Sequence, residues 1–190
     1  MFYAKQEKPE QKLKFQDVFK TLNGFAFKSK QYTTNGSYKV ITIKNITDDG
    51  FSGENSSKIN IDTKCSRYIL RKGEIVMTMT GNIGRIGVVD IDKCLLNQRV
   101  IKIESFSQAY TWSYLKINQK RIENLGKGTA QKNLSLQELN DLPVCNSIEE
   151  IARYKRFDPL YEDMASLLFI KAKLSETKSL LLNRFFGSIS

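Results

Sequence analysis

The chain has 190 residues, of which 41% are hydrophobic, and a formal net charge of +10 without any histidine. Its length accommodates one compact domain plus an appended element. The absence of histidine removes the usual general base, the Ser–His and Cys–His nucleophile pairs and the commonest metal ligand. We therefore expect no catalytic site, no metal and no cofactor, although an enzyme built on carboxylates alone stays open.

Membrane and secretion signals are also missing from the sequence. No run approaches the roughly 18 apolar residues of a membrane span, and the first ten residues include charged side chains but no apolar signal region. The three cysteines, Cys65, Cys94 and Cys145, are odd in number and far apart. Such a set fits reduced core thiols better than a disulfide framework or a zinc site. We expect a cytoplasmic protein.

The first 146 residues combine helical and strand patterns. Residues 13–22 have helical apolar spacing, and residues 107–125 read as a longer helix whose apolar set includes Ile117. A capping box of Ser135 and Glu138 predicts a short helix. The expected strands are residues 38–43, 74–79, 86–89 and 95–103.

Glycines at positions 81, 84 and 87 resemble a dinucleotide-binding fingerprint only superficially. Their spacing is G-x-x-G-x-x-G instead of G-x-G-x-x-G, and a strand follows them where a helix would be needed. The pattern predicts a tight hairpin between two strands, with Arg85 projecting from it.

The positive charge is concentrated in the front of the chain. Residues 147–190 carry seven Lys/Arg and six Asp/Glu, which leaves 23 basic and 14 acidic side chains, a net charge of +9, in residues 1–146. A basic globular domain indicates nucleic acid or another anionic surface, although charge that serves only solubility fits too.

Several basic and amide side chains stand in or beside the expected turns. Aromatic residues at 25, 27 and 32 interleave with lysines, a pattern that serves base or phosphate contact but equally fits two core phenylalanines beside solvated lysines. Lysine suits phosphate contact, whereas arginine and glutamine offer bidentate contacts to guanine and adenine. The candidate contacts, each of which also fits plain surface charge, are Lys28, Lys30, Arg85, Arg99, Lys127, Gln131 and Lys132.

The C-terminal stretch has the seam of a coiled coil. Leucines recur every seven residues at 160, 167, 174 and 181, and a second series alternates with them in steps of three and four. Asp158 and Pro159 are expected to start the helix as N-cap and first residue, after a capping box of Ser147 and Glu150. A helix packed on its own domain is the alternative, but no second helix of matching length precedes this one. The expected dimerisation residues are Phe157, Leu160, Met164, Leu167, Leu168, Leu174, Leu181 and Phe185.

Together these patterns predict an α+β fold, with a mixed, β-rich domain over residues 1–146. A helical region over residues 147–190 follows, and its long C-terminal helix is expected to form a coiled coil.

The order of these signals resembles the DNA specificity (S) subunit of Type I restriction–modification systems. The motifs that carry the resemblance are NGFAFKS at 23–29 with Tyr32, VITIKNI at 40–46, KGEIV at 72–76, TGNIG at 80–84, GTAQKNL at 128–134 and KSLLLNRFF at 178–186. S subunits usually carry two target recognition domains, each followed by a helical region, whereas this chain has one of each. It also has Asn-Ser-Ile-Glu-Glu at 146–150, where the family often has Pro-x-x-Glu-Gln.

The resemblance implies a non-catalytic scaffold. The β-rich domain would recognise a DNA half-site, and the arm would pair antiparallel with that of a second copy in a homodimer. Separate methyltransferase subunits would bind S-adenosylmethionine and methylate a flipped-out adenine, and a restriction subunit would cut unmodified DNA. Two other classes stay open, a catalytic DNA-modifying or cleaving domain with a dimerisation helix and a coiled-coil adaptor for acidic proteins.

Overall fold

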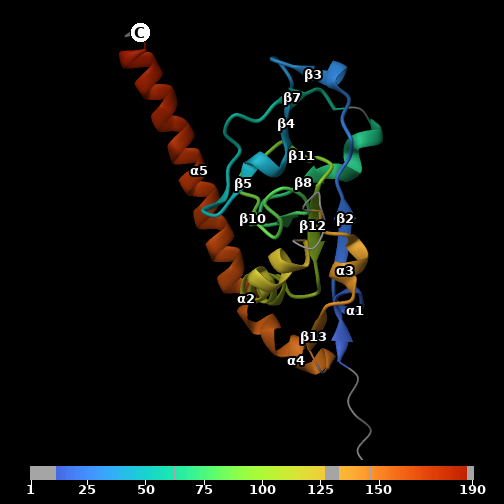
Figure 1. Ribbon diagram of the computed structural model, residues 1–190. Coiled ribbons are helices and arrows are strands. Elements are labelled where there is room, and N and C mark those ends of the chain that lie inside the picture. The colour runs from blue at the N-terminus through green and yellow to red at the C-terminus, as the bar shows by residue number, and fades with distance from the viewer. Residues whose placement is uncertain (1–11, 62, 127–132, 146, 188–190) are drawn as a thin grey trace, which may run out of the picture.

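The computed structural model describes residues 12–61, 63–126, 133–145 and 147–187, and shows a β-rich domain with a long helix running beside it (Figure 1). The predicted α+β fold is confirmed. Within the described residues, no helix is both long and apolar enough to cross a membrane.

Two sheets make the body of the domain. The first is antiparallel, in the order β10 (Ile86–Val88), β9 (Ile75–Thr78), β12 (Val100–Glu104) and β2 (Lys20–Asn23). The second is mixed, in the order β3 (Tyr32–Thr33), β7 (Lys58–Ile59), β4 (Tyr38–Ile41), β11 (Cys94–Leu96) and β8 (Ile69–Leu70), and pairs β11 with β4 in parallel. Two short pairs complete the strands, β1 (Leu13–Lys14) with β13 (Pro143–Cys145) and β5 (Ile46–Thr47) with β6 (Gly50–Phe51).

Alternating side chains of these strands fill three core clusters. On β9, Ile75 and Met77 join a large cluster with the helices, whereas Val76 points into a second cluster with Ile41 of β4. Val40, the neighbour of Ile41, belongs to a third cluster on the other side of the mixed sheet. The two-residue period of a strand therefore buries both faces of these central strands.

Five α-helices and four 3-10 helices lie around the sheets in the described residues. The α-helices are α1 (Phe15–Val18), α2 (Gln108–Leu125), α3 (Leu136–Asn140), α4 (Ile148–Ala152) and α5 (Asp158–Phe186). The 3-10 helices are Ser29–Gln31, Ile43–Asn45, Thr63–Tyr68 and Arg153–Phe157. The N-caps Ser107, Ser135 and Ser147 accept hydrogen bonds from the third residue after each, as expected for helix starts.

The prediction of a helix over residues 13–22 is wrong. Only α1 is helical there, between β1 and β2, because Lys20–Asn23 pairs with β12 from Ile101 to Glu104. The four-residue spacing of Phe15 and Phe19 reflects two rings that contact each other in the core, 4.5 Å apart, and not a longer helix. Tertiary pairing overrides local spacing here.

The strand expected over residues 95–103 is divided in two. Residues 97–99 form a turn in which Arg99 has φ = 71°, so β11 ends at Leu96 in one sheet and β12 begins at Val100 in the other. By contrast, the hairpin expected around the glycines is confirmed, since β9 and β10 pair antiparallel and Gly81 and Gly84 have φ of 71° and 78°. Such values favour glycine.

The start of α5 differs from the expectation. Asp158 is the first residue of α5 and does not cap it. Its Oδ1 instead accepts hydrogen bonds from Ser107 Oγ at 2.8 Å and Ala109 N at 3.0 Å, at the N-terminus of α2. Pro159 does occupy the first turn, where its missing N–H costs nothing.

The arm, α5, packs on the domain only over its first three turns. Tyr161 and Ala165 are buried in the large cluster with α2, and Met164 and Leu168 pack against that cluster. From Lys173 to Gly187 every residue is exposed, and the C-terminal part of the helix diverges from the domain (Figure 1). Two of the residues expected to contact a partner, Met164 and Leu168, therefore contact their own domain.

The leucine series lies outside that contact. Leu160, Leu167 and Leu174 are 65%, 66% and 65% exposed and Leu181 is 49% exposed. Phe157 and Phe185 are exposed as well. On α2, Ile117 is 77% exposed and does not belong to the apolar face, because the core covers only one side of that helix.

Candidate DNA interface

Segments from four parts of the chain meet at the end of β9 and form what we call the loop cluster: residues 23–28, 80–85, 97–99 and Asn133. Backbone hydrogen bonds join them. Phe25 N donates to Leu96 O at 2.9 Å, Gln98 N to Phe25 O at 3.0 Å, and Leu134 N to Met79 O at 2.9 Å. Thr80 and Asn133 form an antiparallel bridge. Loops that are far apart in sequence are thus held together by hydrogen bonds at the ends of the same strands.

Gly24 shows how closely two of these segments approach. A Cβ added to Gly24 would lie 2.0 Å from the carbonyl oxygen of Asn97, which is far inside van der Waals contact. Only glycine allows the chain to pass the turn 97–99 at this distance. The Asn-Gly pair that indicated a turn in the sequence is therefore also a packing requirement.

Arg85 and Arg99 lie on opposite sides of the end of β9. Thr78 N donates to the carbonyl oxygen of Arg85 at 3.0 Å, and Met79 N donates to that of Arg99 at 2.9 Å. Arg99 is exposed. The backbones of two arginines that are 14 residues apart in sequence are thus bonded to adjacent residues, Thr78 and Met79.

The Arg85 guanidinium is already paired in this structure. Its Nε lies 2.9 Å from Asp48 Oδ1 and its Nη2 lies 2.7 Å from Asp48 Oδ2, a two-point pair in which the arginine side chain is 24% exposed. The pair joins the loop after β9 to the turn between β5 and β6. Contact with a base would require Arg85 to exchange the carboxylate for another acceptor.

Lys28, the last residue of its loop-cluster segment, and Lys30, in the 3-10 helix Ser29–Gln31 that follows, are both exposed. The phenylalanines beside them pack in the core, which agrees with the alternative of core phenylalanines beside solvated lysines. Phe27 is buried, and the Phe25 ring contacts Phe27 at 5.0 Å and Tyr68 at 5.2 Å. The remaining candidates, Lys127, Gln131 and Lys132, lie outside the described residues.

Sequence reasoning missed three exposed amides in the loop cluster and one arginine beside it. Asn82, Gln98 and Asn133 are exposed in the segments joined above. The guanidinium of Arg67 lies 4.8 Å from the centre of the Tyr68 ring, which in turn contacts Phe25. The polar run Asn-Gln-Arg at 97–99 interrupts an apolar stretch of the sequence. This interruption could have predicted a turn whose side chains carry hydrogen-bond donors.

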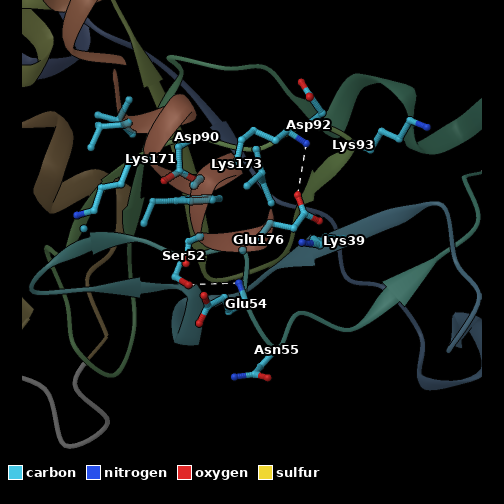
Figure 2. Close-up of a pocket in the computed structure, with 18 of the residues that line it drawn as sticks. Lys39, Ser52, Glu54, Asn55, Asp90, Asp92, Lys93, Lys171, Lys173 and Glu176 are labelled. Atoms are coloured by element: carbon cyan, nitrogen blue, oxygen red, sulfur yellow. Dashed lines mark hydrogen bonds and ion pairs between the residues drawn. The ribbon is translucent and has the colours of Figure 1, made fainter. Parts of the chain in front are cut away.

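A groove of about 990 Å³ lies between α5 and the loops around β5, β6 and β10 (Figure 2), and Asp48, the partner of Arg85, lies in its lining. Six lysines and six acidic side chains line it among the residues that the structure describes, so this lining lacks the excess positive charge that DNA phosphates need. Its ion pair of Lys173 and Glu176, at 3.5 Å, is about half exposed on both sides. Burial raises the pKa of Asp90, which lies in the groove, to about 6.

No group of three or more metal-ligating side chains occurs among the residues described by the structure.

Comparison with protein families decides the classification. Residues 7–145 match the model of the Type I restriction modification DNA specificity domain. The chain belongs to this family. Comparison of the sequence with curated proteins finds no match.

Solved structures from Type I restriction–modification systems share the fold. The S subunit of a Type I restriction-modification system from M. genitalium is 20% identical, with a TM-score of 0.52, and the alignment covers 93% of this chain and 46% of that one. The HsdS subunit from Thermoanaerobacter tengcongensis is 12% identical, with a TM-score of 0.56 and coverages of 98% and 47%. A chain from a structure on complex assembly and conformational transition of the type I R-M system is 12% identical, with a TM-score of 0.56 and coverages of 95% and 45%. The chain spans a little under half the length of these relatives.

Proposed function

We propose that this chain is a sequence-specific DNA recognition subunit of a Type I restriction–modification system, and that it is not itself an enzyme. The observation that carries the proposal is the family match over residues 7–145, which spans the basic domain and all four segments of the loop cluster. The net charge of +9 on residues 1–146 supports DNA as the ligand.

The loop cluster supplies the side chains for base reading in this proposal. Arg99 and Gln98 stand in one turn, and Arg and Gln are the side chains that make paired hydrogen bonds to guanine and adenine edges. Lys28, Lys30, Lys127 and Lys132 act as phosphate contacts, and Arg85 and Gln131 as further base readers. Exposed loops on a rigid β support are a usual place for recognition.

The second part of the proposal is a homodimer through α5. Leu160, Leu167, Leu174, Leu181 and Phe185 form its centre, because these side chains are exposed in the single chain. Phe157 joins them at the start of the arm, whereas Met164 and Leu168 support the seam from the domain side. The helix has 29 residues, about 43 Å at 1.5 Å per residue, which is long enough to separate two domains.

The two arms pair antiparallel in this proposal. A parallel pair would place Lys171 against Lys171 and Lys178 against Lys178, and like charges in a seam repel each other. An antiparallel pair separates these lysines and sends the two recognition domains to opposite ends. Two copies would then make up roughly the length of the solved relatives, which this chain covers by 45–47%.

Such a dimer would bind two inverted copies of one half-site around an unread spacer, since its two domains are identical. It would position methyltransferase subunits, and a restriction subunit where one exists, on this DNA. Adenine methylation and cleavage would belong to those subunits and not to this chain.

Substitution of Arg99 tests the recognition surface. Arg99→Lys keeps the charge but loses paired hydrogen bonds to a base, so discrimination between the selected site and a one-base variant should fall by about 1–3 kcal/mol. Non-specific affinity and its salt dependence should stay the same. Arg121→Ala, an exposed arginine on α2, is the control. Fluorescence anisotropy of labelled duplexes measures both, and unchanged discrimination by Arg99→Lys would remove Arg99 from the interface.

A further inference from the structure

The arm is joined to the recognition domain by a set of polar contacts that we call the arm latch. It consists of Asp158 and Tyr161 on α5 and of Ser107, Ala109 and Gly73 on the domain. Each of these contacts joins the arm to an element at least 49 residues away in sequence. They therefore fix a long-range orientation and not a local turn.

The first point of the arm latch is Asp158, which is 7% exposed. In addition to its bonds to Ser107 and Ala109, its Oδ2 lies 2.6 Å from Lys155 Nζ, and this ammonium also donates to Phe106 O at 2.8 Å. Burial works against the charged carboxylate, but hydrogen bonds from Lys155, Ala109 and Ser107 outweigh it and lower the pKa of Asp158. The start of the arm is thus held on the N-terminus of α2.

The second point is Tyr161, whose hydroxyl donates to the carbonyl oxygen of Gly73 at 2.7 Å. Gly73 has φ = 82°, and a Cβ added there would lie 3.6 Å from that of Ala165, so the turn lies directly against α5. The turn is fixed on the domain side as well, because Gly73 N donates to Val89 O at 2.9 Å. Farther along, Lys72 Nζ lies 5.0 Å from the centre of the Phe169 ring.

β9 connects this turn to the loop cluster without interruption. It begins two residues after Gly73, is buried over Ile75–Thr78, and leads directly into Thr80–Arg85. At about 3.3 Å per residue, the seven steps from Gly73 to Thr80 span roughly 23 Å. The same buried strand thus carries the second latch point at one end and the candidate DNA-contact loop at the other.

From this geometry we propose that Tyr161 is a positioning residue that fixes the angle between arm and recognition domain, and so selects the spacer length between two DNA half-sites. This inference rests on the proposed function. Asp158 and Tyr161 are two polar contacts on one rigid helix, and they add fixed directions to the less directional apolar packing of Met164, Ala165 and Leu168. Each added base pair moves a half-site by about 3.4 Å and turns it by about 35°, so a fixed arm angle would select one spacer sharply.

Tyr161→Phe is the test variant, because it removes the hydroxyl and keeps the ring. Tyr154→Phe is the control, since the Tyr154 ring packs at the base of the arm against Tyr110 at 5.1 Å, outside the arm latch. The duplexes carry two inverted copies of the half-site selected by the wild-type chain from random DNA, with spacers that differ by single base pairs. We expect Tyr161→Phe to reduce the preference for the best spacer over its neighbours at least threefold, with affinity for a single half-site unchanged. An unchanged spacer profile overturns the inference.

A second measurement works without DNA. Spin labels on cysteines introduced at Lys44 in the domain and Thr177 in the arm report their distance by double electron–electron resonance. Labelled chain is diluted into unlabelled chain, and singly labelled chains serve as blanks. A distribution that is narrow in the wild type and broad in Tyr161→Phe supports the arm latch, and equal widths refute it. Because this result does not depend on DNA binding, it separates failure of the arm latch from failure of the proposed function.

Discussion

Replacement of Leu167 and Leu174 by glutamate should convert the proposed dimer into a monomer. Both side chains are about 65% exposed in the single chain, so about two thirds of their apolar surface stays available for a partner. Full burial of a leucine contributes about 1.5–3 kcal/mol, which leaves about 1–2 kcal/mol for each of these side chains.

The double variant removes four such side chains from a two-fold interface. The expected loss is therefore about 4–8 kcal/mol, before any penalty for carboxylates in the seam. At 1.4 kcal/mol for each factor of ten, this weakens the dimer by roughly 10³- to 10⁶-fold. If the wild-type chain is dimeric at micromolar concentration, the double variant should then be monomeric at the same concentration.

Light scattering at micromolar concentration measures the change directly. Ile117→Glu is the matched control, because Ile117 is 77% exposed on α2 and does not belong to the leucine series of α5, so this variant should leave the dimer intact. The recognition domain should stay folded in the double variant, whose substituted side chains do not contribute to the core. A wild-type chain that stays monomeric even on DNA, or a double variant that stays dimeric, would refute the leucine seam.

Three further outcomes follow from the same account. Lys127→Ala with Lys132→Ala should weaken DNA binding and reduce the slope of log affinity against log salt by roughly 0.9 for each lost phosphate contact, and an unchanged slope would exclude this loop from the interface. Calorimetric titration of S-adenosylmethionine into the isolated chain should give no saturable heat, and a saturable signal would overturn the non-catalytic assignment. Asp90→Asn should be more stable than the wild type at pH 7.5, because burial raises the folded-state pKa of Asp90 from 3.8 to about 6. The wild type should therefore gain stability as pH falls from about 6 towards 4, where only the folded state has taken up the proton, and Asp90→Asn should lack this gain in thermal melts across that range.

Local patterns were sufficient wherever a short stretch of sequence decides its own structure. The glycines at 81 and 84 predicted the hairpin, and Ser135 predicted the start of α3, because positive φ angles and N-caps depend on one or a few residues. The length of α5 likewise followed from its apolar repeat and from Pro159.

Long-range pairing decided what local patterns could not. Residues 20–23 form a strand only because β12 lies beside them, and nothing within residues 13–22 encodes that neighbour. Asp158 looked like the cap of its own helix, and its actual partners, Ser107 and Ala109, are about 50 residues away. Similarly, the pairing of Arg85 with Asp48 across 37 residues has no signal in the sequence.

The leucine repeat was informative about spacing but not about direction. A heptad pattern does not say which side of the helix meets its own domain. The structure divides the expected seam, with Met164 and Leu168 against the core and Leu167 and Leu174 exposed. The alternative of a helix packed on its own domain thus holds for one face of the arm, and the exposed face is the one that we propose for a second copy.

DNA recognition by a two-fold dimer can be measured by selection from a random pool of double-stranded DNA with the purified chain. We expect the enriched sequences to contain two inverted copies of one short half-site, separated by a spacer of constant length and free composition. Enrichment of a single asymmetric site would contradict the homodimer, and no enrichment at low salt would contradict DNA recognition itself.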